Sequence, residues 1–183
     1  MLHSERDLIT RIKDGDTRLF SVLVDEYSVA VYSLVVRIVG RKEDAEEVTQ
    51  DVFLKAFESL HTFNFRSSFS TWLYRIACNC ALSKMRRKRQ CYCEIDESRL
   101  QAVSDSQADS LEDMIENQQQ IEKLLQAIGR LSAEDRVLLM LYYYEECSIA
   151  ECAMVTSLSE NLVKVRLHRI RKKLYILLTD ETK

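Results

Sequence analysis

Proline is absent from this 183-residue sequence, and glycine occurs only three times. Both residues disfavour the interior of a helix, glycine by about 1 kcal/mol and proline by about 3 kcal/mol relative to alanine. Their scarcity, in a chain with many Leu, Glu, Lys, Arg and Gln residues, predicts an almost wholly helical protein. Gly15, Gly40 and Gly129 lie where amphipathic patterns stop, which is typical of helix C-termini. The expected fold class is all-α, and the length allows one or two small domains.

Several signatures of catalysis and metal binding are also missing. The sequence has no Gly-rich phosphate-binding loop, and His3, His61 and His168 are isolated, with no nucleophile or acid–base constellation around them. None of the six cysteines has the C-x-x-C spacing of a zinc site. We therefore expect no catalytic residue, no cofactor and no metal ligand, and we predict that the protein is not an enzyme.

Signals for export or membrane insertion are weak as well. The start, MLHSERDLITRIK, has no apolar core of signal-peptide length. The longest strongly apolar stretch, residues 29–36, is too short to span a bilayer. We predict a cytoplasmic protein without direct membrane insertion, in which the cysteines are mostly reduced thiols.

Charge is distributed unevenly along the chain, although the formal net charge is only −3. Residues 90–117 carry eight acidic side chains and one basic side chain, and they lack helical periodicity. This composition favours a solvated linker over a packed element. It predicts a first domain over residues 1–90, an acidic linker over 91–117 and a second domain over 118–183. The charge of the linker is expected either to mimic nucleic acid in the channels of a partner or to discourage binding to free DNA.

The first domain is predicted to contain four helices. A short helix covers residues 4–13, a long one follows an Asp16 cap and ends at Gly40, a third covers 44–59, and a fourth begins at a Ser70/Thr71 cap. Apolar residues recur at helical spacing in the last three. The residues expected in the core are Leu19, Phe20, Leu23, Val24, Tyr27, Val31, Leu34, Val35, Ile38, Ala45, Val48, Val52, Ala56, Trp72, Leu73, Ile76, Ala77 and Leu82.

An aromatic and polar loop, HTFNFRSSF at residues 61–69, precedes the fourth helix, which ends in the basic run Lys84–Arg89. Phe63 and Phe65 could stack on DNA bases, which contributes about 1–3 kcal/mol per base, and the basic run could hold phosphates. The alternatives are that the two phenylalanines plug the edge of the domain and that the basic run is a solvated helix end. A base that is flipped out of the opened DNA could also form hydrogen bonds with Asn64, Arg66 and Ser67.

The second domain is also predicted to contain four helices, the last two of which form a helix-turn-helix candidate. Ser132, Ser148 and Ser159 are expected to cap its last three helices, and the final helix runs to about Leu178. The predicted buried face of that helix carries Leu162, Val163, Leu167, Ile170 and Leu174. The face that would enter a major groove carries Glu160, Asn161, Lys164, Val165 and His168. Asn can read adenine, Lys guanine and Val a thymine methyl. Phosphate contacts are expected from Arg166, Arg169, Arg171, Lys172 and Lys173.

Three stretches of the chain resemble the extracytoplasmic-function (ECF) group of bacterial sigma factors, the two-domain members of the sigma-70 family. Residues 44–57, DAEEVTQDVFLKAF, are similar to the helix that docks on the clamp of RNA polymerase core. Residues 69–77, FSTWLYRIA, followed by Asn79, Ala81 and Arg86-Arg87, are similar to the segment that melts the promoter and reads its −10 element. Residues 148–174 are similar to the helix-turn-helix that reads the −35 element.

This resemblance implies a sigma factor that binds core polymerase, reads the −35 and −10 elements and stabilises the melted strand. The implied contacts with core polymerase are Glu47, Gln50, Asp51 and Lys55. The implied −10 contacts are Phe63, Asn64, Arg66, Ser67, Asn79, Arg86 and Arg87. The implied −35 contacts are Glu160, Asn161, Lys164, Val165, Arg166, His168 and Arg169. The implied partners are the clamp and flap of RNA polymerase core, promoter DNA and an anti-sigma factor.

The chain departs from the family pattern at three positions of the helix-turn-helix. Ser157 stands where a turn glycine is frequent, Leu162 where Thr is frequent, and Ile170 where Ala is common. Two other interpretations of the residues stay open at this point. One is a stand-alone helix-turn-helix regulator with an N-terminal sensing or dimerisation domain, and the other is a redox or metal sensor that uses the cysteines.

Overall fold

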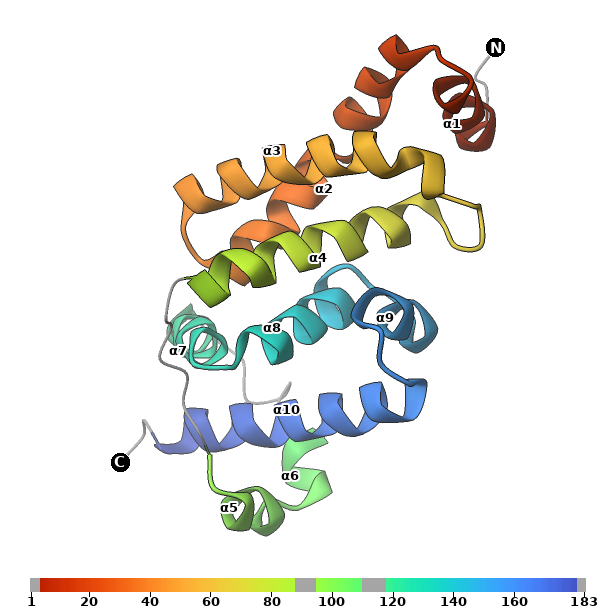
Figure 1. Cartoon of the computed structure of the whole chain (residues 1–183). Coiled ribbons are helices and arrows are strands. Elements are labelled where there is room, and N and C mark those ends of the chain that lie inside the picture. The colour runs from red at the N-terminus through yellow and green to blue at the C-terminus, as the bar shows by residue number, and fades with distance from the viewer. Residues whose placement is uncertain (1–3, 88–94, 110–117, 181–183) are drawn as a thin grey trace. The chain divides into compact units, whose positions relative to one another are not determined.

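The computed structural model describes residues 4–87, 95–109 and 118–180, and all regular structure in these ranges is helical (Figure 1). This confirms the all-α fold class. The chain divides into two compact units, the first essentially the residues up to Arg87 and the second essentially the residues beyond it. Each unit has its own buried core.

The first unit contains four α-helices and two short 3-10 turns. Its helices are α1 (Glu5–Lys13), α2 (Phe20–Val39), α3 (Lys42–Ser59) and α4 (Phe69–Arg87), and its turns are Thr17–Leu19 and Leu60–Thr62. Helices α2, α3 and α4 pack against one another pairwise. Most of the residues predicted for this core are buried, and the structure adds Phe53, Phe69, Tyr74 and Cys78.

Local signals explain most of the helix ends in the first unit. Gly40 ends α2 in the left-handed conformation, with φ of 79°, which glycine adopts without steric cost. The cap of α4 is Ser68, whose Oγ accepts a hydrogen bond from the Thr71 amide at 3.1 Å, so the prediction of a Ser70/Thr71 cap is wrong by two to three residues. Asp16 makes no capping hydrogen bond and pairs instead with Arg11 at 2.8 Å.

Helix α2 is longer and more apolar than the stretch 29–36 suggested. Together with the preceding 3-10 turn it forms 23 residues, 17–39, that by length and composition alone are sufficient to cross a membrane. A core helix of a globular domain meets the same condition. In this unit α2 packs on α3 and α4 and buries Leu23, Val31, Leu34 and Ile38 completely.

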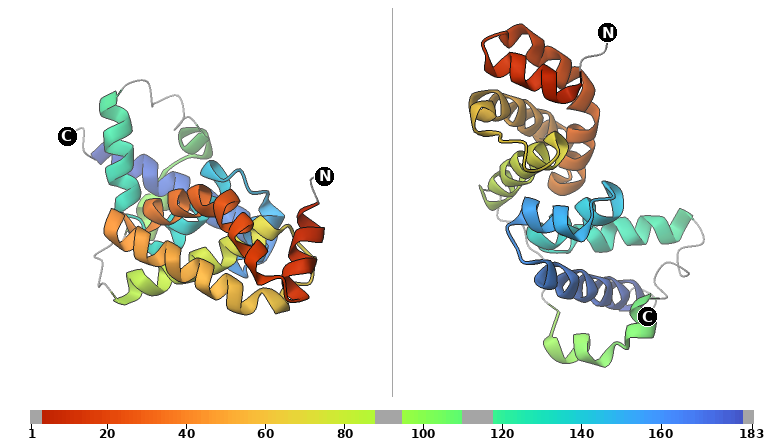
Figure 2. Two further views of the ribbon diagram at one scale, coloured as in Figure 1. Left: turned by 90° about the horizontal axis from the view of Figure 1, so that it is seen from above. Right: turned by 90° about the vertical axis from the view of Figure 1, so that its right-hand side faces the viewer.

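The second unit is organised around its last helix. It contains α5 (Glu97–Ala102), α6 (Asp105–Asp109), α7 (Gln118–Gly129), α8 (Ala133–Leu139), a π-helical turn (Met140–Tyr144), α9 (Ile149–Thr156) and α10 (Glu160–Asp180). Helix α10 contacts α5, α6, α7 and α8. Figures 1 and 2 show α5 and α6 on the side of α10 opposite α8.

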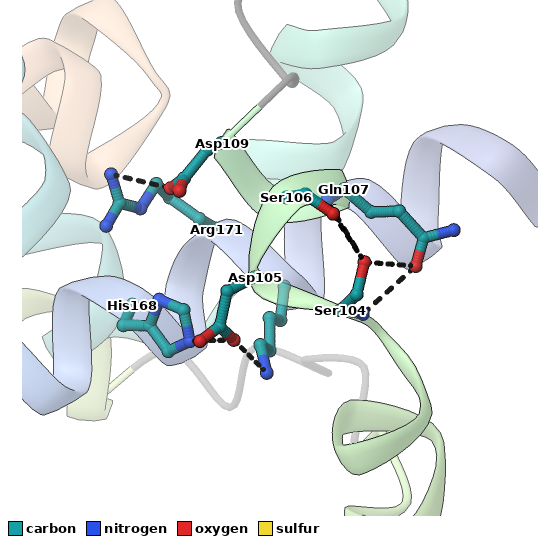
Figure 3. Close-up of polar contacts among 8 residues, drawn as sticks. Ser104, Asp105, Ser106, Gln107, Asp109, His168 and Arg171 are labelled. Carbon is teal, nitrogen blue, oxygen red and sulfur yellow. Dashed lines mark hydrogen bonds and ion pairs between the residues drawn. The ribbon is translucent and has the colours of Figure 1, made fainter.

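Residues 95–109, called the acidic segment below, dock on α10 through two apolar side chains, whereas the sequence predicted a linker without packing; their charged side chains are largely exposed. Leu100 and Val103 are buried against Ile176 of α10, with Ile95 and Tyr175 beside them. Ser104 Oγ accepts a hydrogen bond from the Gln107 amide at 3.2 Å and so caps α6 (Figure 3). The composition concealed this packing because two apolar residues at i and i+3 are enough to dock one helical turn. Residues 110–117 lie outside the described part of the chain.

Candidate nucleic-acid interface

Helices α9 and α10 form the predicted helix-turn-helix. Ser148 caps α9 with a complete capping box, in which its side chain meets the Glu151 amide and the Glu151 carboxylate accepts from the Ser148 amide. Ser159 Oγ accepts from the Leu162 amide at 3.3 Å at the start of α10. Ser157 between them has φ of 60°, so the position does require the left-handed backbone that glycine provides more cheaply. The predicted caps at Ser148 and Ser159 are confirmed.

The first two turns of α10 present an exposed face. Glu160, Asn161, Lys164 and Val165 are all exposed there, and Val165 is 56% accessible. Leu162 was predicted to be buried and is 47% exposed, so that prediction is wrong. The core side of the helix is formed instead by Val163, Leu167, Ile170 and Leu174, all of them buried. An amide, an ammonium group and apolar groups therefore line the part of α10 that a major groove would meet first.

Arg166 and Lys173 have a structural role on α10. Their side chains converge on the buried carboxylate of Asp135 in α8, at 2.8 Å and 2.6 Å respectively. Burial alone would raise the pKa of Asp135, but the hydrogen bonds from Lys173 and Arg166 outweigh it and lower that pKa. Arg166 and Lys173 therefore help to hold α8 against α10, and the prediction that they also contact DNA stays a prediction.

Four other basic side chains of α10 are paired with the acidic segment, whereas Lys164 is exposed. Arg169 bonds to Glu97 at 2.6 Å, and Lys172 and His168 meet Asp105 at 2.9 Å and 3.0 Å. Arg171 lies 3.6 Å from Asp109 (Figure 3). The hydrogen bond from Lys172, with the charges of Lys172 and His168, lowers the pKa of Asp105, so this carboxyl is ionised at neutral pH. The predicted −35 contacts His168 and Arg169 thus lie on the predicted face but have internal partners.

The loop before α4 combines a buried aromatic cluster with exposed polar groups. Phe63 is only 3% exposed, and its ring lies 4.9 Å from Phe65, 5.7 Å from Phe69 and 5.4 Å from Trp72 between centroids. In this structure Phe63 is therefore packed in an aromatic cluster, as in the alternative that it plugs the edge of the domain, and its stacking on a base stays a prediction. The polar residues of the loop are accessible: Asn64 and Arg66 are exposed, and Ser67 is partly exposed.

Phe65 occupies a strained position at the tip of this loop. Its φ of 60° lies in the left-handed region, which is costly for a bulky residue. The Arg6 guanidinium lies 4.9 Å from the centre of its ring and the Lys13 ammonium 5.6 Å, both within cation–π range. Lys13 also donates to the Phe63 carbonyl at 2.8 Å. Helix α1 therefore holds the loop in one conformation, a support that the sequence motifs did not indicate.

Asn79, Arg86 and Arg87 are exposed along α4. Asn79 lies in a pocket whose other lining residues come from α4, the end of α3 and the turn after it. They are Lys55, Glu58, Ser59, His61, Ile76, Cys80 and Ser83. Lys55, predicted to contact polymerase, donates to Cys80 Sγ at 3.4 Å and so lines this pocket. Lys88 and Arg89, the rest of the basic run, lie outside the described residues.

The predicted docking helix α3 presents charged residues beside an apolar groove. Glu47, Gln50 and Asp51 are exposed, and Glu47 pairs with Lys84 of α4 at 2.5 Å. The hydrogen bond to Glu47 raises the pKa of Lys84, which keeps the pair ionised. Next to Gln50 lies a groove lined by Phe20, Val24, Ser28, Thr49, Phe53, Leu54 and Phe57. Leu54 is 61% exposed and Phe57 43%, an apolar contribution that sequence reasoning missed.

The cysteines show no sign of redox or metal chemistry in the described residues. Cys78, Cys80, Cys147 and Cys152 are buried free thiols. Burial, with nearby acidic charges, raises the pKa of Cys147 to about 12 and that of Cys152 to about 11, so both are protonated at neutral pH. No group of three or more His, Cys, Asp or Glu residues is placed to hold a metal within the described ranges. Cys91 and Cys93 lie outside those ranges.

Comparisons with known proteins agree with this geometry. The chain matches the sequence models of sigma-70 region 2 over residues 23–91 and sigma-70 region 4 over residues 121–174. It is 32% identical over 178 residues to the ECF RNA polymerase sigma factor SigW of Bacillus subtilis, which covers 94% of this chain and 95% of that protein. It is 30% identical over 175 residues to the ECF RNA polymerase sigma-E factor of Escherichia coli K12, covering 92% and 91%.

Solved structures give the same result. CnrH, in complex with the cytosolic domain of CnrY, matches with a TM-score of 0.70 and 26% identity over 98% of this chain and 99% of that one. The sigma factor RpoE of Bartonella quintana, solved with the anti-sigma factor NepR, shares the fold with a TM-score of 0.63 and 22% identity, over 87% and 96%.

Two separately packed helical units, one of which carries a helix-turn-helix, define a modular DNA-binding transcription factor. The two family matches and the nearly full-length relatives show that the chain belongs to the ECF sigma factors of the sigma-70 family. It is an RNA polymerase sigma factor, and the interpretation as a stand-alone regulator is not favoured.

Proposed function

We propose a division of labour in which the first unit binds core polymerase and the −10 element and the second unit reads the −35 element. The observation that carries this proposal is the exposed end of α10. Asn161, Lys164 and Val165 stand on a capped helix start, while the other side of the helix is buried. Such an arrangement presents base-reading groups to a major groove and leaves the rest of the helix to fix their position.

Core polymerase is proposed to bind α3 through a mixed polar and apolar surface. Gln50 lines the apolar groove with Leu54 and Phe57, and Asp51 is exposed on the same helix. Exposed large apolar side chains at the centre of a polar rim are typical of protein interfaces. The same surface is a suitable target for an anti-sigma factor. RpoE was solved in complex with the anti-sigma factor NepR, and CnrH in complex with the cytosolic domain of CnrY.

The −10 element is proposed to meet the loop 61–69 and the exposed side of α4. Asn64 and Arg66 offer polar contacts at the loop tip, and the partly exposed Phe65 is the aromatic ring best placed to stack on a base. Phe63 supports the loop from below. Asn79, Arg86 and Arg87 extend the polar surface along α4, where the two arginines face phosphates.

The second unit is proposed to act next to the flap of polymerase, where α10 reads the −35 element. Glu160, Asn161, Lys164 and Val165 are the proposed reading residues. We further propose that the protein acts in the cytoplasm and by binding alone. It would catalyse no reaction and would need neither a cofactor nor a metal. In this proposal the protein stabilises the melted DNA strand, and base stacking and phosphate contacts supply the free energy of binding that strand.

The test is run-off transcription with purified core polymerase and a promoter pool randomised in the −35 and −10 elements. Lys164→Ala should abolish the preference at −35 positions and leave core binding unchanged, whereas Lys42→Ala, a change at an exposed lysine of α3, should alter neither. Asp51→Lys and Leu54→Ser should weaken core capture on a native gel first. Asp51 is a cleaner site than Glu47, because Glu47→Lys would also oppose Lys84. If the α10 and α3 variants fail at the same step, the division of labour is wrong.

A further inference from the structure

The acidic segment covers the same face of α10 that begins with the proposed reading residues. Residues three and four apart share one face of a helix. Asn161, Lys164 and Val165 are therefore followed on that face by His168 and Lys172, both of which meet Asp105. Duplex DNA that lies on the exposed end of α10 and continues along the helix would meet the acidic segment.

The carboxylates of the acidic segment pair with cations that could otherwise bind DNA phosphates. Glu97, Asp105 and Asp109 reach four basic side chains of α10, at separations from 2.6 Å for Arg169 to 3.6 Å for Arg171. Figure 3 shows the pairs made by Asp105 and Asp109. Arginine and lysine bind phosphate and carboxylate by the same charge-assisted hydrogen bonds. The α10 cations cannot satisfy the segment and a DNA backbone at the same time.

Apolar contacts hold the acidic segment in place independently of its charges. Leu100 is 3% exposed and Val103 is 7% exposed, and both pack on Ile176 near the end of α10. Salt weakens exposed ion pairs, with a screening length of about 8 Å at physiological ionic strength, but it does not weaken apolar burial in this way. Arg99 adds a pair with Asp180 at 2.7 Å. The segment therefore remains docked under conditions in which its ion pairs alone would be weak.

We propose that the acidic segment is an intramolecular competitor of DNA: in the free protein it occupies the cations of α10, and it must be displaced before α10 can lie fully on a duplex. This inference rests on the proposed function of α10 as a DNA-reading helix. Free sigma factor then binds DNA weakly, and whatever draws the acidic segment away raises its affinity.

The experiment compares DNA binding by the full-length chain and two kinds of released variant, without polymerase. Glu97→Gln/Asp105→Asn/Asp109→Asn removes the carboxylates, and Leu100→Ala/Val103→Ala removes the apolar anchor without a change of charge. Fluorescence anisotropy with a labelled promoter duplex should show at least about tenfold tighter binding for both. If Arg169, Arg171 and Lys172 gain phosphates, the slope of log K against log salt should steepen by up to about 2.7 for the charge variant.

A matched control separates release from a general change of charge. Glu122→Gln/Glu134→Gln/Glu146→Gln changes the net charge by the same amount at exposed residues of the second unit that form none of the ion pairs described for α10. If the control gains as much affinity as the charge variant, or if the anchor variant gains none, the competitor role is refuted. Hydrogen exchange on the unaltered chain gives a test that requires no variant: saturating duplex should increase amide exchange over 97–109.

The outcomes also separate this inference from the proposed function. If Lys164→Ala weakens DNA binding but the released variants bind no more tightly than the parent, α10 reads DNA and the acidic segment does not compete. If Lys164→Ala has no effect even in the released variants, the assignment of α10 as the reading helix fails. Circular dichroism of each variant shows whether the helices are retained, and the hydrogen-exchange result decides the inference if they are not.

Discussion

The carboxylate of Asp135 is the point at which α8 and α10 are most strongly joined, and Asp135→Asn tests this directly. The side chain is 4% exposed and receives Arg166 and Lys173 at 2.8 Å and 2.6 Å. The substitution keeps the size of the side chain but removes its charge, so two cations that share one counterion lose it together.

The expected loss follows from the burial of the three partners. Removal of one partner from a fully buried ion pair costs about 3–5 kcal/mol. Arg166 and Lys173 are 31% and 23% exposed, so each can turn partly toward water when the carboxylate is gone. We therefore expect Asp135→Asn to lower the free energy of unfolding of the second unit by about 2 kcal/mol. At about 1–3 kcal/mol per molar urea, the midpoint should fall by roughly 1 M.

Urea unfolding followed by two probes measures this effect. Trp72, the single tryptophan, lies in the first unit, so its fluorescence reports that unit while circular dichroism reports both. The dichroism transition of Asp135→Asn should gain an early phase that is absent from the fluorescence transition. The matched control is Asp105→Asn, which removes a carboxylate that also meets two basic side chains but is 75% exposed, and its effect should be much smaller.

The contribution of Asp135 to the free energy of unfolding should depend on pH. The folded-state pKa of Asp135 is lowered relative to an ordinary aspartate, which titrates near about 3.9 when unfolded. The stabilisation is therefore present above about pH 4 and is lost as the pH falls through the folded-state pKa. Parent and Asp135→Asn should differ fully at pH 7 and converge in acid. An equal difference at pH 7 and pH 3, or an unmoved transition, would refute the role of this carboxylate.

Three further predictions concern the turn, the thiols and the loop. Ser157→Gly should stabilise the second unit by about 0.5 kcal/mol, seen as a small rise in Tm, because glycine adopts positive φ at no steric cost. Cys152, with its pKa of about 11, should carry roughly 250-fold less thiolate at pH 8 than an ordinary cysteine, and mass spectrometry should find it unreacted with iodoacetamide until urea unfolds the unit. Phe63→Ala should destabilise the first unit by about 3–5 kcal/mol in Trp72 fluorescence, whereas Asn64→Ala should leave stability nearly unchanged and weaken promoter opening.

Local chemistry made much of the fold predictable from the sequence. The ends at Gly40, Ser132, Ser148 and Ser159 depend on one or two residues and their own backbone, and all four lie where they were predicted. Helical spacing also identified most of the core of α2 and α3, because a regular stripe of apolar residues leaves little choice of buried face.

Tertiary partners decided what the sequence could not show. Arg166 looked like a phosphate ligand, but a carboxylate 31 residues away in the chain takes its charge. Phe63 looked like a stacking platform, but three other rings enclose it. The acidic segment looked like a linker, because the helix face that it covers is about 70 residues distant in sequence. In each case the polarity or shape of the side chains suited two roles, and the neighbour that the structure shows was not adjacent in sequence.

The acidic segment belongs to the same molecule as α10, so dilution does not reduce its concentration near that helix. A ligand tethered to its own site can reach an effective concentration in the millimolar range, whereas non-specific DNA binding has dissociation constants of about 10⁻⁴–10⁻⁶ M at physiological salt. Such a tethered competitor lowers the apparent affinity of every duplex by the same factor. Duplexes that offer only phosphates then fall below useful occupancy first, while those that also satisfy Asn161 and Lys164 remain bound. Under the proposed competition, the ion pairs of Figure 3 raise the affinity that a duplex needs in order to be occupied, and we expect promoters to exceed it more often than other DNA.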